Sequence, residues 1–222
     1  MRPGTHRAAR YTPPVASVDT TSTWWNAGST SSCVAAWLAK GAASQAASYV
    51  NLVTPGTYNA APGMAPTWNT ATGWTFDGTS KYLTTGLTPA ATWSIIARCA
   101  NCTLEFLSAL MGCRSASNER FFIASRYNND SHIYAHGSAS VIAGLLTAGV
   151  MAMTPTNGYL NGTSETAVGT ISGALVSLYL GGENNNGTLQ NGLYGDLLAA
   201  AVYNAALTGD QVAAISTAMA AL

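Results

Sequence analysis

A series of short apolar runs separated by turn-forming residues is the feature that most limits what this chain can fold into. Three of the turns that we expect are Asp77-Gly78, Asn157-Gly158 and Asn161-Gly162, pairs that favour tight β-hairpins. Strands this short and this often interrupted are typical of a β-sandwich or barrel, and not of alternating strands and helices. The runs that we expect to form strands are Trp74–Phe76, Tyr82–Thr85, Trp93–Ala97, Phe121–Ala124, Ile133–Tyr134, Val141–Leu146, Val150–Met153, Tyr159–Leu160, Val176–Leu180 and Leu197–Tyr203.

Helices are expected at two places outside these runs. The segment from Ser31 to Leu52 is rich in alanine, and we expect two short helices there, separated at Lys40-Gly41, where glycine can end a helix. Near the C-terminus, Thr208 and Gln211 have the spacing of a capping box. The residues that follow place an apolar stripe on one helical face, made of Val212, Ile215 and Met219.

Residues 1–23 differ in character from the rest of the chain. They are polar and contain Pro3, Pro13 and Pro14, and we expect an extended arm in front of a single domain at 24–222. The arm holds a basic cluster, which we expect to dock on an assembly and not on nucleic acid. The candidate assembly residues in the arm are Arg2, Arg7, Arg10 and Tyr11.

Charge is scarce throughout the sequence. Only 8% of the residues are charged, against about 25% in ordinary soluble proteins, and the formal net charge is +0. A nucleic-acid partner is not expected, because it needs a basic footprint. No apolar run is long enough to predict a membrane span, and the N-terminus lacks the apolar region of an ordinary signal peptide. Low charge favours association, so we expect a homo-oligomer in an assembled or extracellular setting.

Several motifs between roughly residues 68 and 222 follow one another in an order that has a family counterpart. They are Gly73–Gly78 with Tyr82-Leu83, Trp93–Ile95, Gly158–Gly162, Leu178–Gly182, and Tyr194–Asp196 followed by Val202–Thr208 and Gln211-Val212. Together they resemble the laminin-G-like domains of the concanavalin-A-like lectin/glucanase superfamily. The resemblance implies an all-β, antiparallel jelly-roll sandwich with a C-terminal helix. In general style, the chain also resembles single-domain structural proteins of tailed phages.

The acidic residues do not form the pattern that enzymes of that superfamily use. Those enzymes hydrolyse glycans with two carboxylates, commonly as Glu-x-Asp-x-x-Glu on one strand, one protonating the leaving oxygen and the other attacking or activating water. Here no two acidic residues lie within eight positions of each other. A Gly-x-Ser-x-Gly motif is also missing, and we expect His132 and His136 to face one sheet surface as structural residues. The sequence therefore predicts no catalytic residues and no enzyme.

The four cysteines leave three interpretations open. Cys99, Cys102 and Cys113, with His132 or His136, supply the number and type of ligands of a zinc site, but the usual paired spacing is missing. A disulfide and buried free thiols are the alternatives, and sequence does not choose among the pairings. We take Cys102–Cys113 as the candidate disulfide, because pairing Cys99 with Cys102 would strain an extended strand.

Two loops and a tryptophan pair are the candidate binding residues. The loops are Asn128-Asn129-Asp130 and Glu183-Asn184 with the two asparagines that follow. Their oxygens suit weak Ca²⁺ binding, although asparagine is also a common turn former, so no cofactor is required. Because Trp24 and Trp25 are adjacent, we expect one ring to face the core and the other to anchor a partner.

Three functions remain in view from the sequence. We expect a non-catalytic structural or binding module on a bacteriophage virion surface, as capsid decoration or tail component, that contacts other virion proteins through its arm and adheres to surface glycans. A secreted carbohydrate-binding lectin is the alternative. A glycoside hydrolase is the third reading, which the carboxylate pattern disfavours.

Overall fold

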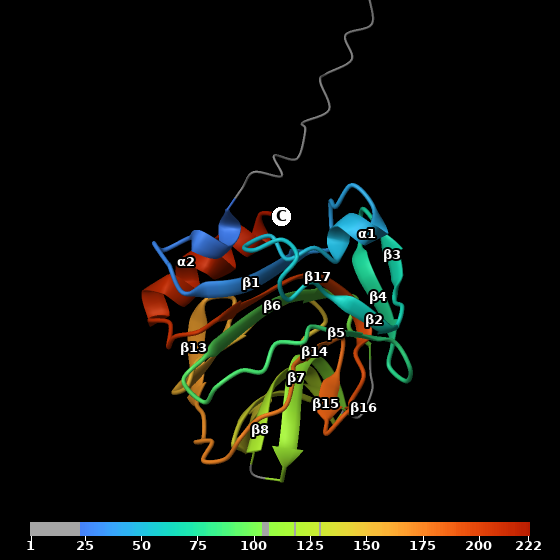
Figure 1. The fold of residues 1–222 in the computed structure, drawn as a ribbon. Coiled ribbons are helices and arrows are strands. Elements are labelled where there is room, and N and C mark those ends of the chain that lie inside the picture. The colour runs from blue at the N-terminus through green and yellow to red at the C-terminus, as the bar shows by residue number, and fades with distance from the viewer. Residues whose placement is uncertain (1–22, 104–106, 118, 129) are drawn as a thin grey trace, which may run out of the picture.

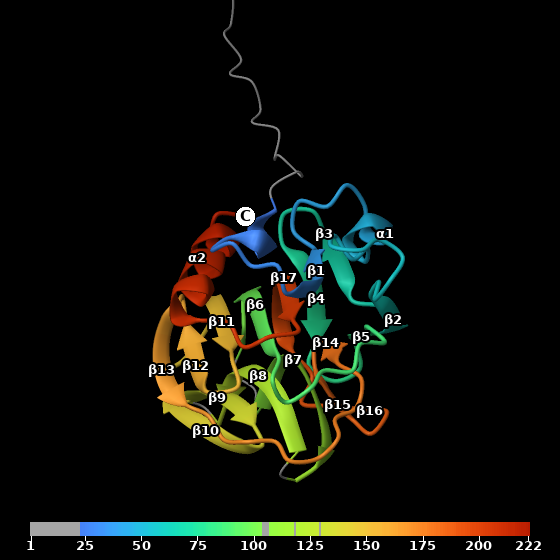
Figure 2. The same ribbon diagram turned by 60° about the vertical axis from the view of Figure 1, so that its left-hand side comes forward.

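The computed structural model describes residues 23–103, 107–117, 119–128 and 130–222, and they are mostly β-structure. Two sheets lie face to face as a sandwich, with short helices beside them (Figures 1 and 2). The predicted all-β sandwich is confirmed. The predicted arm falls on residues 1–22, outside the described residues. No helix of the described part is long and apolar enough to cross a bilayer.

Sheet A, the first of the two sheets, has eight strands arranged around β17 (Tyr194–Tyr203). One edge of β17 pairs with β6. Along its other edge, the first residues of β17 pair with β4 and the later ones pair with β1. All of these pairings are antiparallel. In sheet order, the other strands are β13 (Thr163–Ala167), β12 (Asn157–Leu160), β11 (Gly149–Met153), β6 (Ser94–Ala100), β4 (Gly73–Asp77) and β3 (Thr67–Asn69), with β1 (Cys33–Leu38) beside β17.

Sheet B has nine strands and is arranged around β7 (Leu107–Ala116). One edge of β7 pairs with β8, and the other pairs with β14 and with β15, the last in parallel. The remaining bounds are β10 (Ser138–Ala143), β9 (Ser131–His136), β8 (Glu119–Tyr127), β14 (Tyr179–Leu180), β5 (Tyr82–Thr84), β2 (Ala61–Met64), β15 (Glu183–Asn185) and β16 (Thr188–Gln190).

The main core lies between the two sheets. Trp37 and Trp74 are both fully buried there, and each indole N–H has an acceptor. Nε1 of Trp37 donates to the carbonyl of Tyr58 at 3.2 Å, and Nε1 of Trp74 donates to Oγ of Ser48 at 2.8 Å. These bonds let the two largest side chains bury their rings without leaving a polar atom unpaired.

The outer face of sheet A is also covered. The 3-10 helix η1 (Trp24–Asn26) and the helix α2 (Gly209–Ala220) lie against it. The predicted capping box is present, since Thr208 accepts from the amide of Gln211 and Gln211 accepts from that of Thr208. The expected helical face is buried against the sheet, through Val212, Ile215 and Met219.

The alanine-rich segment corrects one prediction. We expected two helices between Ser31 and Leu52, but Cys33–Leu38 form strand β1, and only Gln45–Ser48 form a short helix, α1. Helix propensity is a weak preference that tertiary packing often overrides. Here the small side chains of Ala35 and Ala36 are completely buried in a strand paired with β17.

The glycine turns follow the sequence in most places. Asn161 and Gly162 both have left-handed backbones, with φ of 50° and 82°, as a tight hairpin turn requires. Asn157-Gly158 is different, because it lies inside β12 and not in a turn. A Cβ placed on Gly158 would lie 2.4 Å from the ring of Tyr134, so this glycine makes room for a core side chain.

We predict that Gly158→Ala lowers the free energy of unfolding by about 1–3 kcal/mol, because the new methyl group overpacks the core against Tyr134. Gly209→Ala is the matched control, since its Cβ would make an ordinary contact of 3.8 Å with Tyr159. That control should stay within about 1 kcal/mol of the parent. Urea unfolding of both variants tests this, and equal losses would contradict it.

Candidate functional site

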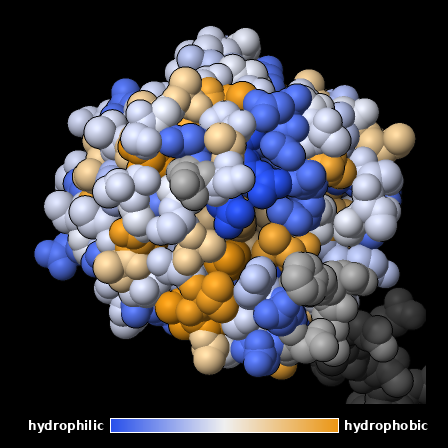
Figure 3. Space-filling model, turned by 90° about the horizontal axis from the view of Figure 1, so that it is seen from below, coloured by the Kyte–Doolittle hydropathy of each residue, from blue (hydrophilic) through white to orange (hydrophobic). Residues whose placement is uncertain are grey.

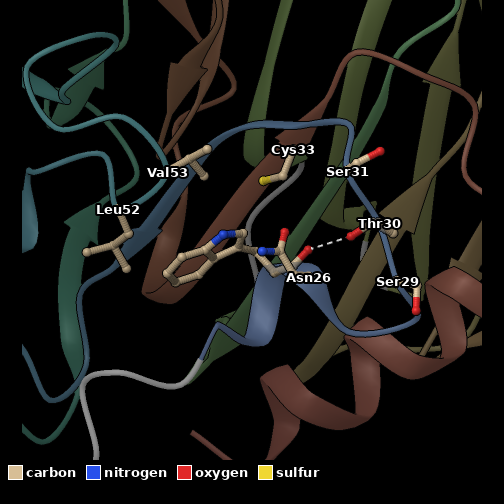
Figure 4. A pocket seen from close by; sticks show the side chains of 8 residues that line it. Asn26, Ser29, Thr30, Ser31, Cys33, Leu52 and Val53 are labelled. Atoms are coloured by element: carbon tan, nitrogen blue, oxygen red, sulfur yellow. Dashed lines mark hydrogen bonds between the residues drawn. The ribbon is translucent and has the colours of Figure 1, made fainter.

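An open hollow of about 460 Å³ lies where η1, the loop after it and β1 meet the segment that follows Asn51 (Figure 4). Its lining combines an indole, two aliphatic side chains, a thiol and four hydroxyl or amide groups. None of the lining side chains is charged. They are Trp25, Asn26, Ser29, Thr30, Ser31, Cys33, Leu52 and Val53.

The loop beside the hollow is held in an uncommon backbone conformation. Gly28 and the following Ser29 both have left-handed backbones, with φ of 74° and 59°. For serine this costs roughly 1–2 kcal/mol, and such strain concentrates at functional sites. Two hydrogen bonds to the carbonyl of Trp25 fix the loop. One comes from Oγ1 of Thr30 at 2.8 Å (Figure 4), and the other comes from the phenol of Tyr203 at 2.9 Å.

The tryptophan pair corrects a second prediction. We expected one ring to face the core and the other to point outward, but Trp24 and Trp25 are only 3% and 9% exposed. A 3-10 helix turns each residue by about 120°, and the two rings pack edge to face with centroids 5.6 Å apart. Both rings therefore enter the core cluster on sheet A. Trp25 also borders the hollow.

The sequence did not single out the polar residues of the hollow. Asn26, Ser29 and Ser31 are exposed, while Thr30 is buried. The signal that could have found them is the mostly polar, glycine-containing stretch directly after the tryptophan pair. Hydroxyl and amide groups can donate and accept, and an indole with aliphatic neighbours offers an apolar wall. This combination suits a neutral ligand rich in hydroxyl groups.

The predicted loop at Glu183 and Asn184 is a buried polar cluster instead. Glu183 lies in β15 with its side chain fully buried. Its Oε1 is 3.3 Å from Nε of Arg114, close enough for an ion pair but not aligned for a hydrogen bond. Burial raises the pKa of Glu183, although Arg114 and Asn191 oppose the shift.

Figure 3 shows hydrophilic residues gathered beside an apolar patch on the face seen from below, where β7, β8, β15 and β16 lie.

The amide of Asn184 is fully engaged within the protein. Its Nδ2 donates to the carbonyl of Ser177 at 2.6 Å, and its Oδ1 accepts from the amide of Gly187 at 2.6 Å. These bonds organise the β15–β16 hairpin. The oxygens that sequence analysis offered to Ca²⁺ thus have internal partners here.

The other predicted oxygen-rich loop is only partly described. Asn128 adopts a left-handed turn with φ of 55°, and the carbonyl of Asp130 accepts from the amide of Gly144 at 2.7 Å. Asn129 lies outside the described residues. Within the residues that the structure describes, no three His, Cys, Asp or Glu side chains are grouped as metal ligands.

His132 and His136 face the same side of β9, as expected, and are buried. The ring of His132 is bonded at both nitrogens, to the carbonyl of Gly144 at 3.0 Å and to Oε2 of Glu165 at 2.8 Å. The phenol of Tyr134 donates to the same Oε2 at 2.8 Å. Burial and the carboxylate raise the pKa of Tyr134, so the phenol remains a proton donor. Sequence analysis missed Glu165, because 31 residues separate it from Tyr134.

All four cysteines are free thiols in the structure, and the predicted bond between Cys102 and Cys113 is not formed. Cys113, which lies on β7, is close to Val176 and Glu183. Cys102 instead lies close enough to Cys99 for the two thiols to interact, and its thiol donates to the carbonyl of Ala100 at 3.7 Å. The chain turns between Cys99 and Cys102 at Asn101, whose backbone is left-handed with φ of 51°. Strand β6 ends before this turn, so the two cysteines do not lie in one extended strand as we expected.

Comparison with known proteins places the fold but not a sequence family. No protein-family model matches the chain, and no curated protein matches it. The solved structures similar to it include Trypanosoma rangeli sialidase in complex with 2,3-difluoro-KDN, with 14% identity and a TM-score of 0.60 over 85% of this chain and 33% of that chain. A mutant of the same sialidase with trans-sialidase activity has 16% identity, a TM-score of 0.60 and the same coverage.

A third similar structure is an isolated domain. It is domain 4 of AbnA, a GH43 extracellular arabinanase from Geobacillus stearothermophilus, in complex with arabinotriose. The identity is 15% and the TM-score 0.51, over 83% of this chain and 98% of that domain. This chain thus spans about a third of the sialidases and nearly all of the arabinanase domain.

These similarities show a shared β-sandwich fold. They give no support to the laminin-G assignment or to the link with tailed phages. They also contradict the prediction that the chain is not an enzyme, because the proteins that share its fold are glycoside hydrolases, namely sialidases and an arabinanase.

We predict that Thr30→Val loosens the loop that forms the hollow, because it removes one of the two hydrogen bonds to the carbonyl of Trp25 while keeping the shape of the side chain. The free energy of unfolding should fall by about 1 kcal/mol. Thr30→Ser, which keeps the hydroxyl, is the control and should lose less. Urea denaturation compares the two, and equal values for both would mean that this bond does not hold the loop.

Proposed function

We propose that this protein is a carbohydrate-binding domain that binds a neutral oligosaccharide in the hollow beside η1. The observation that carries the proposal is the composition of that hollow. It sets the indole of Trp25, Leu52 and Val53 against the side chains of Asn26 and Ser29 and two further hydroxyl groups. Sugars present both C–H faces and hydroxyl groups, so a binding site needs an apolar wall and uncharged hydrogen-bonding groups together.

The fold supports a carbohydrate ligand. Domain 4 of the arabinanase AbnA, which is similar to this chain over nearly its whole length, was solved with arabinotriose bound. Binding sites are set by local residues and not by the fold, so the choice of sugar has to come from the hollow itself.

The lining favours neutral sugars over acidic ones. A carboxylated sugar such as sialic acid needs a positively charged partner, usually arginine. None of the eight lining side chains carries a charge. Arg114, on the face described above, is paired with Glu183 and Gln190. We therefore expect arabinotriose and other neutral oligosaccharides to bind, and sialic acid not to bind.

Titration calorimetry with arabinotriose, a panel of neutral oligosaccharides and sialic acid tests this function. Asn26→Ala should weaken binding of the best neutral ligand about fivefold, because it removes hydrogen bonds worth about 1 kcal/mol. Asn26 is exposed, so the fold should not suffer. Thr79→Ala is the control, because Thr79 is exposed on a different turn and does not line the hollow.

Two results would contradict the proposal. One is the absence of binding to every neutral glycan at millimolar concentration. The other is binding that Asn26→Ala and Ser31→Ala leave unchanged, which would place the sugar on another surface.

We further propose that the arm attaches the domain to an assembly at an outer surface, either of a virion or of a cell. Support comes from the arginines of residues 1–23 and from the low charge of the chain, 8% of residues, which leaves little repulsion between copies. Self-association through the domain and the attachment of other proteins to the arm both belong to this proposal.

Deleting residues 1–22 should leave the β-sheet circular dichroism signal and the melting temperature of the domain unchanged, since we expect this polar, proline-containing segment to be an arm in front of a self-sufficient domain. The homo-oligomer expected of the full chain should persist in the truncated protein, because self-association is proposed to run through the domain. Light scattering at micromolar concentration measures both masses. A full chain that is monomeric, or a truncated chain that dissociates, would contradict this part of the proposal.

A further inference from the structure

Cys99 and Cys102 are brought together at the end of strand β6. Cys99 is the second-last residue of that strand, and its side chain belongs to the main core. The left-handed turn at Asn101 then brings Cys102 back, so that the two thiols lie close enough to interact, and the thiol of Cys102 donates to the carbonyl of Ala100 at 3.7 Å. The amide of Cys102 donates to the carbonyl of Thr147 at 2.9 Å, which fixes the turn.

The guanidinium of Arg126 is buried beside this pair. Arg126 is 2% exposed, and among the described residues its Nε and Nη1 have no hydrogen-bond partner. Nη2 makes a long bond of 3.4 Å to the carbonyl of Cys102. In the described part of the chain, no carboxylate forms an ion pair with Arg126. A buried cation without a counter-charge is costly, and a thiolate on Cys102 would provide that counter-charge.

The surroundings make Cys102 the more acidic of the two thiols. The neighbouring Cys99 lowers the pKa of Cys102, and although burial opposes this, Ser125 and the charge of Arg126 lower it further. Asp196 is the acidic group that acts against them; its two oxygens accept from Thr75 at 2.5 Å and from Asn101 at 2.7 Å. The pKa of Cys99 is raised by the neighbouring Cys102 and by burial.

We propose that Cys99 and Cys102 form a reversible dithiol–disulfide site in which Cys102 reacts first with a small-molecule disulfide. The thiolate of Cys102 attacks one sulfur of that molecule, breaks its S–S bond and releases one thiolate, which leaves a mixed disulfide on Cys102. Cys99 then loses its proton to solvent and attacks the sulfur of Cys102. The second small thiolate leaves, and the protein has lost two electrons and two protons to the small disulfide, which becomes two thiols.

The position of Cys102 allows this reaction although the thiol itself is buried. Cys102 is 3% exposed, but its neighbours Asn101 and Thr103 are both exposed. A local opening of the turn is therefore enough to admit a small reagent. Because the disulfide closes a loop of only a few residues, its effect on the unfolded chain is small. The bond therefore serves as a redox response more than as a structural brace.

The other two cysteines serve as matched controls. Burial raises the pKa of Cys33 and of Cys113 to about 12 in each case. No other cysteine is among the groups that shift the pKa of Cys33 or of Cys113. Substituting them should therefore leave the reaction of the pair intact.

The test uses the folded full chain, incubated in a buffer of reduced and oxidised glutathione, because the order of reaction depends on the folded surroundings of the two thiols. We expect the number of titratable thiols to fall from four to two and the mass to fall by about 2 Da, with peptide mapping that assigns the bond to Cys99 and Cys102. Cys33→Ser and Cys113→Ser should still form it. Cys99→Ser should instead accumulate the glutathione mixed disulfide on Cys102, whereas Cys102→Ser should accumulate none on Cys99.

Three outcomes would overturn the proposal. They are four free thiols after incubation of the folded protein under oxidising conditions, a bond mapped to Cys102 and Cys113, and a mixed disulfide that forms on Cys99 in preference to Cys102. Thermal melting of the oxidised and reduced forms should differ by only a few degrees, and a large gain in stability would indicate a structural brace instead.

Discussion

Burial of sheet A on both faces is the constraint on which the rest of the structure depends. Its central strand, β17, has side chains in the main core on one face and in the cluster under η1 and α2 on the other. Every residue of β17 after Tyr194 is buried. A strand in such a position reads as a continuous apolar run, and Leu197–Tyr203 has that pattern. The hollow exists because Tyr203, at the end of this strand, holds the carbonyl of Trp25.

The sequence was sufficient where short-range chemistry decides the structure. The capping box at Thr208, the left-handed turn at Asn161-Gly162 and many of the strand runs depend on neighbouring residues, and they were predicted. The run of β7 was not among the expected strands, although β7 is the central strand of sheet B. Cys33–Leu38 were not, because alanine favours a helix and only the distant strand β17 makes a strand of them. The prediction of a turn at Asn157-Gly158 was wrong because a distant residue decides there too. Gly158 lacks a side chain where the ring of Tyr134 packs against the strand.

The candidate site was less accessible to sequence reasoning than the fold. Trp25 was identified, but the 3-10 turn that buries it and its neighbour depends on contacts with α2 and the sheet. The polar lining comes from a stretch with no motif, and Leu52 and Val53 join it only through the path of the chain after β1. Glu183 was identified from the sequence but placed in the wrong kind of structure. Its asparagine-rich surroundings indicated a loop, whereas the ion pair with Arg114 requires β7 and β15 to lie side by side.

The bond between Tyr203 and Trp25 has a consequence for how the chain folds as it is made. The two residues are 178 positions apart, and ribosomal synthesis at 5–20 residues per second would separate their appearance by roughly 10–35 s. During that interval η1 and β1 have no sheet to join, so their tryptophans and alanines face water. Contacts of such long sequence separation slow folding. Completion of the domain is therefore governed by the arrival of its last strand, and the earliest elements are the last to dock.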